Sequence, residues 1–241
     1  MDVIILAAGL GSRLGEKTSE VPKAMVQVAG RELILRVMDF LDHPEIGSIS
    51  VVAGYKTEVL QAFLKQHCPK VQVYFNPHFV KGSIFTLEAA LPHMSNDFLL
   101  MNVDHIYPRR MLKKILANRD HDIMGICDFD RDLITDDMKV KLDSKKCIHK
   151  IHKQLTDFDC GYIGMSYVSQ GMLETYQKAA HELVTVKGEM APVEWILGLL
   201  AEQNLPVGIC DVSGFGWLEV DNQEDLERAE AVLASNPAYL A

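Results

Sequence analysis

Hydrophobic residues recur in short blocks along this chain, with more polar segments between them. Six mainly apolar blocks have the length of buried strands: Val3–Ala8, Ile49–Ala53, Val71–Phe75, Phe98–Val103, Ile123–Cys127 and Val207–Val212. Segments with a helical spacing of apolar positions follow the first four blocks or lie close to them: Glu32–Leu41, Thr57–Gln66, Ser83–Leu91 and Arg109–Ala117. This alternation predicts βαβ units and a doubly wound, mainly parallel α/β sheet with helices on both faces.

The pattern changes between residues 139 and 168. Polar and apolar residues alternate in Lys139–Leu142 and again in Ile148–Ile151, on either side of a turn-like polar stretch. This predicts a half-exposed hairpin, followed by a further strand over Gly161–Tyr167 that makes the sheet mixed. Helical spacing then returns at three places: Gly171–Ala180, Pro192–Gln203 and Gln223–Leu233. Because no repeat, linker or low-complexity segment is present, we predict a single domain over residues 1–241 with a small β-rich insertion at 139–168.

Composition narrows the function classes. Lys and Arg number 24 against 33 Asp and Glu, which gives a formal net charge of −9 without any run of basic residues. Such a chain is a poor nucleic-acid binder, so we expect no nucleic-acid partner. Five scattered cysteines without a CxxC pair favour a reducing compartment. The start of the chain is unlike a secretory signal, and no segment has the ~20 apolar residues of a membrane span. We expect a cytoplasmic protein whose oligomeric state is open, with a homodimer among the options.

The strongest motif follows the first apolar block. Residues 6–14 read LAAGLGSRL, and Pro22-Lys23 comes shortly after. Glycines at the carboxyl end of a strand let main-chain N–H groups approach phosphate oxygens, and Arg13 and Lys23 add positive charge suited to a pyrophosphate and a reacting phosphate. The spacing of Gly15 fits neither the dinucleotide fingerprint nor the Walker loop.

Two aspartates supply the second signal. Asp104 follows the apolar block that ends at Val103, and Asp221 lies in the string WLEVDNQEDLERAE. Ligands bind at the carboxyl ends of strands in open α/β sheets, and Mg²⁺ prefers one or two carboxylates with phosphate oxygens and water. Taken alone, each aspartate is equally well explained as a helix N-cap or as strand-end solvation.

These motifs resemble the signature of the sugar-phosphate and alcohol-phosphate nucleotidyltransferases, in order and in spacing. The resemblance implies a Rossmann-like nucleotidyltransferase fold, a cofactor Mg²⁺ held by Asp104 and Asp221, and catalytic roles for Arg13 and Lys23. It also implies a set of nucleotide-binding residues: Leu6, Ala7, Ala8, Gly9, Gly11, Ser12, Arg13, Lys23, Asn76, Gly82 and Ser83.

A finer resemblance concerns the acceptor. The segments Asn102–Tyr107, Asp137–Leu142 and Asp159–Ile163 resemble those of inositol-1-phosphate cytidylyltransferases, and Gly82–Leu87 is also similar to bacterial choline-phosphate cytidylyltransferases. This implies transfer of CMP from CTP to a phosphorylated alcohol, giving a CDP-alcohol for phospholipid or cell-surface precursor synthesis and releasing pyrophosphate. The chain departs from the inositol pattern at Asn102, where Gly is expected, and at Cys160, where Thr is expected.

Four residues are candidates for binding the acceptor: His105, Lys141, Lys153 and Asp159. Lys141 and Lys153 would lie near the acceptor phosphate, although strand alternation alone also puts lysines on the wet face of a hairpin. His105 follows Asp104 directly and could contact the acceptor, or it could be a strand-end histidine with structural contacts only.

Several alternatives stay open at this point. The acceptor could be choline phosphate or, with UTP, dTTP or GTP as donor, a sugar 1-phosphate. A glycosyltransferase is less compatible, since its expected acid-x-acid pair is replaced here by Asn102-Val103-Asp104. A non-catalytic nucleotide-binding module has no physical need for both cations and both aspartates.

Overall fold

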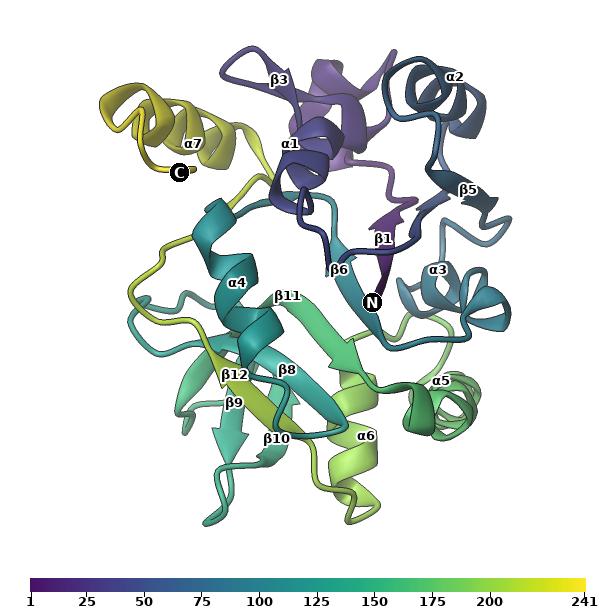
Figure 1. Cartoon of the computed structure of the whole chain (residues 1–241), viewed down its shortest axis with the longest axis vertical. Coiled ribbons are helices and arrows are strands. Elements are labelled where there is room, and N and C mark those ends of the chain that lie inside the picture. The colour runs from purple at the N-terminus through teal and green to yellow at the C-terminus, as the bar shows by residue number, and fades with distance from the viewer.

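Strand β1 (Asp2–Ala7) lies inside a nine-stranded sheet, as its apolar pattern predicts. In the computed structural model, which describes residues 1–241, β1 pairs in parallel with β4 (Ile49–Ala53) and β6 (Phe98–Asn102). Strand β5 (Gln72–Phe75) pairs in parallel with β4 and forms one edge (Figure 1). The carboxyl ends of β1 and β6 therefore lie side by side, which is where the motif that begins at Leu6 and the residue Asp104 emerge.

Strand β11 (Cys160–Val168) makes the sheet mixed. It runs antiparallel to β6, to β8 (Ile123–Asp128) and to β9 (Lys139–Leu142). The predicted hairpin is confirmed, because β9 pairs antiparallel with β10 (Ile148–His152). Strand β12 (Gly208–Asp211) pairs in parallel with β8. The doubly wound α/β fold with a mixed sheet is thus confirmed, and the β-rich segment extends the main sheet, while the single-domain organisation stays a prediction.

Alternating side chains of β1 separate two cores. Val3, Ile5 and Ala7 pack into one hydrophobic cluster and Ile4 and Leu6 into another. Because successive strand residues point to opposite faces, each face needs its own cover. The helices on the first face are α1 (Leu33–Phe40), α2 (Thr57–His67) and α4 (Arg109–Ala117), and those on the second are α3 (Ile84–Glu88), α5 (Leu173–Lys187) and α6 (Trp195–Glu202).

Two of the helices that differ from their predicted limits do so for a clear physical reason. The helix predicted over Ser83–Leu91 is α3 followed by a separate 3₁₀ turn at Leu91–His93, because a proline at position 92 disfavours helical continuation. The helix predicted to end at Ala180 continues to Lys187, with Leu183 still buried, and stops before Gly188 at a φ of 88°. None of the helices combines the length and the hydropathy that a bilayer crossing requires.

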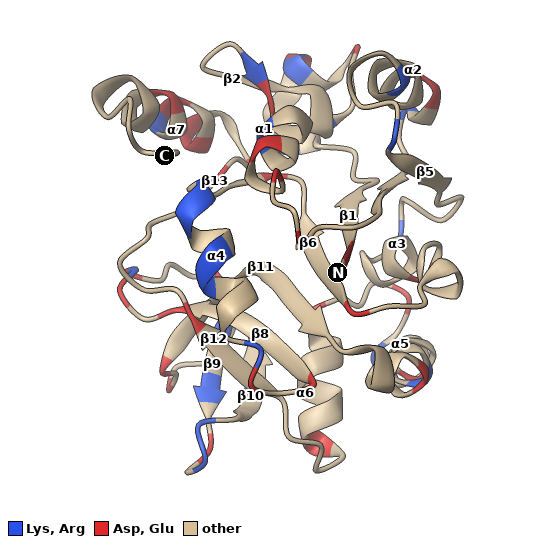
Figure 2. Ribbon diagram, in the orientation of Figure 1, with Lys and Arg blue, Asp and Glu red and all other residues tan.

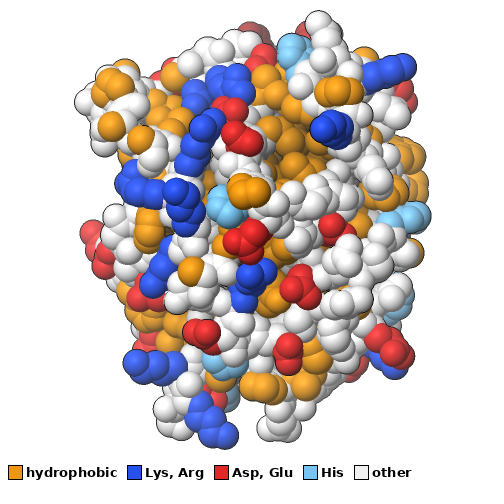
Figure 3. Space-filling view, viewed as in Figure 1, with side chains coloured by type: hydrophobic (Ala, Val, Ile, Leu, Met, Phe, Trp, Pro, Cys, Tyr) orange, Lys and Arg blue, Asp and Glu red, His pale blue; other side chains and the backbone are white.

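Charged side chains lie mainly at the periphery of the fold. The central strands β6 and β11 carry none, and the helices and hairpins around them carry most (Figure 2). On the face in Figure 3, basic and acidic side chains are intermixed. A cluster of charged side chains next to these uncharged strands is therefore a candidate functional site.

A third hydrophobic cluster ties the N-terminal loop to the C-terminal segment. It includes a short ribbon in which β7 (His105–Ile106) pairs with β13 (Leu218–Glu219), and it ends on α7 (Gln223–Ser235). Its buried members are Leu14, Val26, Val28, Leu33, Ile106, Val220, Leu226 and Ala229. Since Leu14, Ile106 and Val220 are each within two residues of a predicted site residue, this cluster brings distant parts of the chain to one place.

Candidate active site

The two predicted metal aspartates meet because of the β7–β13 ribbon. Glu219 pairs with His105 in that ribbon, and the Val220 amide donates a hydrogen bond to the Asp104 carbonyl at 2.9 Å. Asp104 and Asp221 therefore leave the ribbon at the same end. Asn222, whose side chain accepts from the Asp225 amide, is the residue that caps α7, so capping does not account for Asp221.

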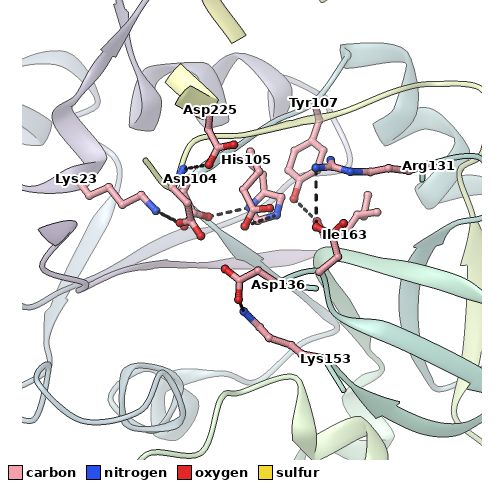
Figure 4. A network of polar contacts seen from close by, with 12 residues as sticks. Lys23, Asp104, His105, Tyr107, Arg131, Asp136, Lys153, Ile163 and Asp225 are labelled. Atoms are coloured by element: carbon pink, nitrogen blue, oxygen red, sulfur yellow. Dashed lines mark hydrogen bonds and ion pairs between the residues drawn. The ribbon is translucent and has the colours of Figure 1, made fainter. Parts of the chain in front are cut away.

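Lys23 lies between these two carboxylates. Its ammonium group is 2.7 Å from Asp104 Oδ2 and 2.5 Å from Asp221 Oδ1, and its side chain is only 11% exposed. Figure 4 shows the Lys23 side chain reaching toward Asp104 from its own segment. Asp104 and Asp221, which lie 81 and 198 positions after Lys23 in the sequence, thus share its ammonium group.

The loop before Lys23 is shaped by its glycines. Gly11 has a φ of 66°, and a Cβ there would lie 2.8 Å from the Thr18 side chain and 2.9 Å from Lys23 Cβ, so only glycine fits. The Thr18 hydroxyl donates to the carbonyls of Gly11 and Gly15, which closes the loop on itself. Pro22 is extended and precedes the 3₁₀ turn that carries Lys23. The loop at Gly11 and the turn that begins after Pro22 therefore fix the position of the first part of the Lys23 side chain.

Burial and ion pairing oppose each other in this cluster. Burial alone would lower the pKa of Lys23, but the carboxylates of Asp104 and Asp221 outweigh it and raise that pKa. Burial would likewise raise the pKa of Asp104, yet Lys23 and His105 hold it well below its usual range. Lys23 and Asp104 are consequently both charged at neutral pH, which is the state needed to bind phosphates and a metal ion.

Arg13 extends the network toward the acceptor side. Its guanidinium is 2.6 Å from Asp221 Oδ2 and 3.0 Å from Asp136 Oδ2. The other oxygen of Asp136 accepts from Lys153 at 2.6 Å, a contact visible in Figure 4. A continuous chain of ion pairs thus joins Lys153 to Arg13 and Lys23 across the cleft.

His105 is stacked in the wall of the site. Its Nδ1 lies 2.7 Å from Asp104 Oδ1, and its ring lies between Tyr107 and Trp217 at centroid distances of 5.7 and 5.3 Å. The Trp217 indole donates to Asp128 at 2.9 Å, which fixes that wall. Burial would lower the pKa of His105, but nearby carboxylates raise it.

A small pocket of about 50 Å³ opens beside this wall. Its lining includes His105 and Lys153, two of the predicted acceptor residues. The other two do not line it: Lys141 pairs with Asp157 at 2.6 Å and with Asp159 at 3.4 Å on the exposed side of the hairpin. The acceptor-binding roles of these four residues remain predictions.

The second predicted nucleotide segment uses its polar groups to fix its own loop. The Asn76 amide donates to Thr86 at 3.0 Å and accepts from the His78 amide at 2.8 Å. The Ser83 hydroxyl accepts from the Val193 amide, and the Gly82 amide donates to a carbonyl of the same neighbouring segment. Any contact of this loop with a base would thus come from main-chain groups, and it stays a prediction.

The two aspartates have the chemistry of a magnesium site. Both carboxylates reach one ammonium group, so they converge on a common point, and oxygen donors are what Mg²⁺ prefers. The structure contains no group of three or more His, Cys, Asp or Glu residues arranged to hold a metal ion. Two carboxylates completed by phosphate oxygens and water fit the known preference of Mg²⁺.

Three further acidic residues at the site were not singled out from the sequence. Glu219 ends β13, two positions before Asp221, and this period-two spacing could have revealed it. Asp136 and Glu194 lie in or next to loops, where no periodicity points to them. They enter the site only through the folding of the chain.

Comparisons with known proteins show which family the chain resembles over most of its length. The model of the MobA-like NTP transferase domain matches residues 3–134. The bifunctional IPC transferase and DIPP synthase of Archaeoglobus fulgidus is 30% identical over 98% of this chain, which spans only 44% of that protein. The choline-phosphate cytidylyltransferase of Streptococcus pneumoniae is 26% identical over 97% of this chain and 98% of its own length.

A solved structure, that of the inositol-1-phosphate CTP transferase from T. maritima, superposes with a TM-score of 0.82 at 21% identity and covers 96% of both chains. This likeness confirms the predicted nucleotidyltransferase fold. The family model covers more than half of the sequence and includes the loop with Arg13, the turn with Lys23 and the strand before Asp104. The chain belongs to the family of MobA-like NTP transferase domains.

Proposed function

We propose that this chain is a magnesium-dependent CTP:alcohol-phosphate cytidylyltransferase, with inositol 1-phosphate as the first acceptor to test. The observation that carries the proposal is the position of the Lys23 ammonium group, within 2.7 Å of carboxylates from two distant segments. The names of the matched proteins, inositol-phosphate and choline-phosphate cytidylyltransferases, support CTP as the donor. Choline phosphate and the sugar 1-phosphates with other nucleotides are the alternatives.

The reaction needs little proton chemistry. An oxygen of the acceptor phosphate attacks the α-phosphorus of CTP, and the bond from that phosphorus to the oxygen of the leaving pyrophosphate breaks. The attacking oxygen is already anionic at neutral pH, so no general base is required. The barrier comes from bringing two anions together in line and from the charge that develops on the α-phosphate and the pyrophosphate.

The residues of the site match that task. Lys23 would stabilise the α-phosphate, and Arg13 with the amides of residues 9–12 would hold the β- and γ-phosphates. Asp104 and Asp221 would hold Mg²⁺, which supplies charge neutralisation for both reactants when bound. In the free protein the carboxylates neutralise Lys23 and Arg13, and these cations would become available to phosphates if Asp104 and Asp221 held the metal ion.

This arrangement resolves a tension in the composition. A chain with a net charge of −9 repels polyanions over most of its surface. Arg13, Lys23 and Lys153 belong to one continuous network of ion pairs, in which Asp104, Asp136 and Asp221 balance their charge. These cations would face phosphates where a metal ion takes up the carboxylates.

The test is a matrix of four nucleoside triphosphates against a panel of phosphorylated alcohols and sugars, read by pyrophosphate release with Mg²⁺ present. We expect the highest kcat/KM with CTP and a phosphorylated alcohol. A glycosyltransferase or a binding module would release no pyrophosphate with any pair. Release only with a sugar 1-phosphate would move the function to the sugar nucleotidyltransferases.

A further inference from the structure

The pocket beside His105 contains a carboxylate that has no partner. Glu194 lines this pocket at the start of α6, where its main-chain carbonyl accepts from the Leu197 amide at 3.1 Å. The segment before it is anchored by the hydrogen bond from the Val193 amide to Ser83. The backbone of Glu194 is thus held next to the predicted nucleotide loop, with its side chain on the acceptor side.

The other carboxylates of the pocket are all occupied. Asp136 binds Arg13 and Lys153, and Asp137 accepts from the Ile134 amide at 2.7 Å. Glu219 lies 3.8 Å from the Nε2 atom of His105. By contrast, Glu194 forms no ion pair and no hydrogen bond through its side chain to another residue, and burial raises its pKa. The donor that acts on this carboxylate is its own main-chain amide, so most of its acceptor positions are unused and a ligand that supplies donors would bind there.

Asn102 is the second unused polar group in this pocket. It stands at the end of β6, two residues before Asp104, at the position where the inositol pattern expects Gly. Its amide forms no side-chain hydrogen bond in the structure, and its Nδ2 packs closely over Gly164, 3.1 Å from where a Cβ would be. Because the Asn102 amide can donate and accept and the Glu194 carboxylate accepts, the two side chains can together satisfy a ligand hydroxyl as donor and as acceptor.

We propose that Glu194 and Asn102 bind the hydroxyl groups of the acceptor alcohol, so that the preferred acceptor is the phosphate of a polyol. This inference rests on the proposed function and names the substrate class at the same site. Glu194 would accept from one or two hydroxyls, and Asn102 would donate to or accept from a neighbouring one. Lys153, at the same pocket, would be available for the acceptor phosphate.

Asn102 is the group that argues against a cationic head group. A quaternary ammonium would be attracted to the Glu194 carboxylate and to the aromatic surface of Trp217 and Tyr162, but it neither donates nor accepts a hydrogen bond and would leave the Asn102 amide without a partner. A primary ammonium only donates and would leave the Asn102 amide N–H groups without an acceptor. A polyol hydroxyl donates and accepts, and therefore satisfies both side chains.

The experiment measures binding directly, so that its result does not depend on turnover. Calorimetric titration of inositol 1-phosphate and of methyl phosphate into the unsubstituted protein, Glu194→Gln and Asn102→Ala, with Mg²⁺ and a non-hydrolysable CTP analogue, gives the dissociation constants. We expect Glu194→Gln to weaken inositol 1-phosphate binding by about ten- to hundred-fold, since a hydrogen bond to a charged group is lost. Methyl phosphate, which has no hydroxyl, should bind equally to all three.

Glu189→Gln is the matched control. Glu189 lies five positions before Glu194, is 62% exposed and pairs with Lys81 outside the pocket, so the same chemical change there should leave both constants unaltered. Equal loss of both ligands in Glu194→Gln, or unchanged inositol 1-phosphate binding, would overturn the inference, as would tight binding of choline phosphate that depends on Glu194. Failure of the proposed function is a separate result, namely the absence of pyrophosphate release with every donor and acceptor.

Discussion

The two sides of the cleft differ in how their charges are satisfied. On the nucleotide side, Lys23 and Arg13 each contact two carboxylates in the free protein, with N–O distances between 2.5 and 3.0 Å. On the acceptor side, the Glu194 and Asn102 side chains line the pocket and form no hydrogen bond or ion pair with another residue. The first side is organised before any substrate arrives, which lowers the cost of ordering the groups that act on the phosphates. On the acceptor side the hydrogen bonds form only when the ligand binds. An acceptor that lacks the matching groups would leave these polar side chains unpaired, so the site would discriminate against it.

On the nucleotide side, removal of the metal ion or of its predicted ligands should lower turnover the most. We expect chelation by EDTA, Asp104→Asn and Asp221→Asn each to lower pyrophosphate release by about three orders of magnitude or more, because a metal ion contributes several kcal/mol of charge stabilisation. Turnover should return on addition of Mg²⁺ to the chelated protein and not to the two variants. Full activity without any divalent ion would contradict the paired arrangement as the metal site.

Replacement of Lys23 should have the next largest effect. Lys23→Ala removes the cation that both aspartates hold in place, and we expect kcat to fall by about 10²–10³-fold, the range for loss of one group that stabilises transition-state charge. A near-normal rate would rule out this role. Thermal unfolding in Mg²⁺ checks the fold, since the variant leaves two carboxylates facing each other.

Lys178→Ala is the control for that measurement. Lys178 pairs with Glu174 on the exposed surface of α5, with 73% of its side chain accessible, so the same substitution there should change neither kcat nor the unfolding temperature appreciably. A comparable loss in both variants would mean that the rate follows overall charge and not the position of Lys23.

The two sides of the site also differ in how much of each could be predicted from the sequence. The strands could be predicted because alternation and apolar blocks report burial directly. Arg13, Lys23, Asp104 and Asp221 could be singled out by the motifs that contain them, and the structure brings these four residues together, while their roles remain predictions. Their meeting depends on the β7–β13 ribbon, whose two strands have two residues each, too short to show any period.

The acceptor side left no such signal. Glu194 precedes an apolar helix and has the pattern of an ordinary N-terminal turn, and Asp136 lies in an irregular loop. Lys141 and Asp159 were selected from segments that resemble inositol-1-phosphate cytidylyltransferases, and the structure pairs Lys141 with Asp157 and Asp159 outside the lining of the pocket. A single carboxylate in a loop becomes informative only when the fold shows what surrounds it.

Asp136 is where the two sides meet, and its replacement should have the smallest effect. Its carboxylate bridges Arg13 and Lys153, so it occupies the position of an anion between the predicted nucleotide and acceptor cations and competes with incoming phosphates. These pairs are about half exposed, and such pairs contribute about 0.2–1 kcal/mol each. We therefore expect Asp136→Asn to bind pyrophosphate about two- to five-fold more tightly in calorimetric titrations with Mg²⁺.

The matched control for this last change is Asp157→Asn. It removes the same charge from an exposed pair with Lys141, so it separates loss of the bridge from a general reduction of negative charge. The difference between the two variants should shrink as salt rises, because exposed ion pairs are screened. Equal binding in both variants would mean that phosphates do not displace Asp136. Weaker binding in Asp136→Asn would mean that the carboxylate positions Arg13 and Lys153 for phosphates, and the paired network would then extend into the acceptor side.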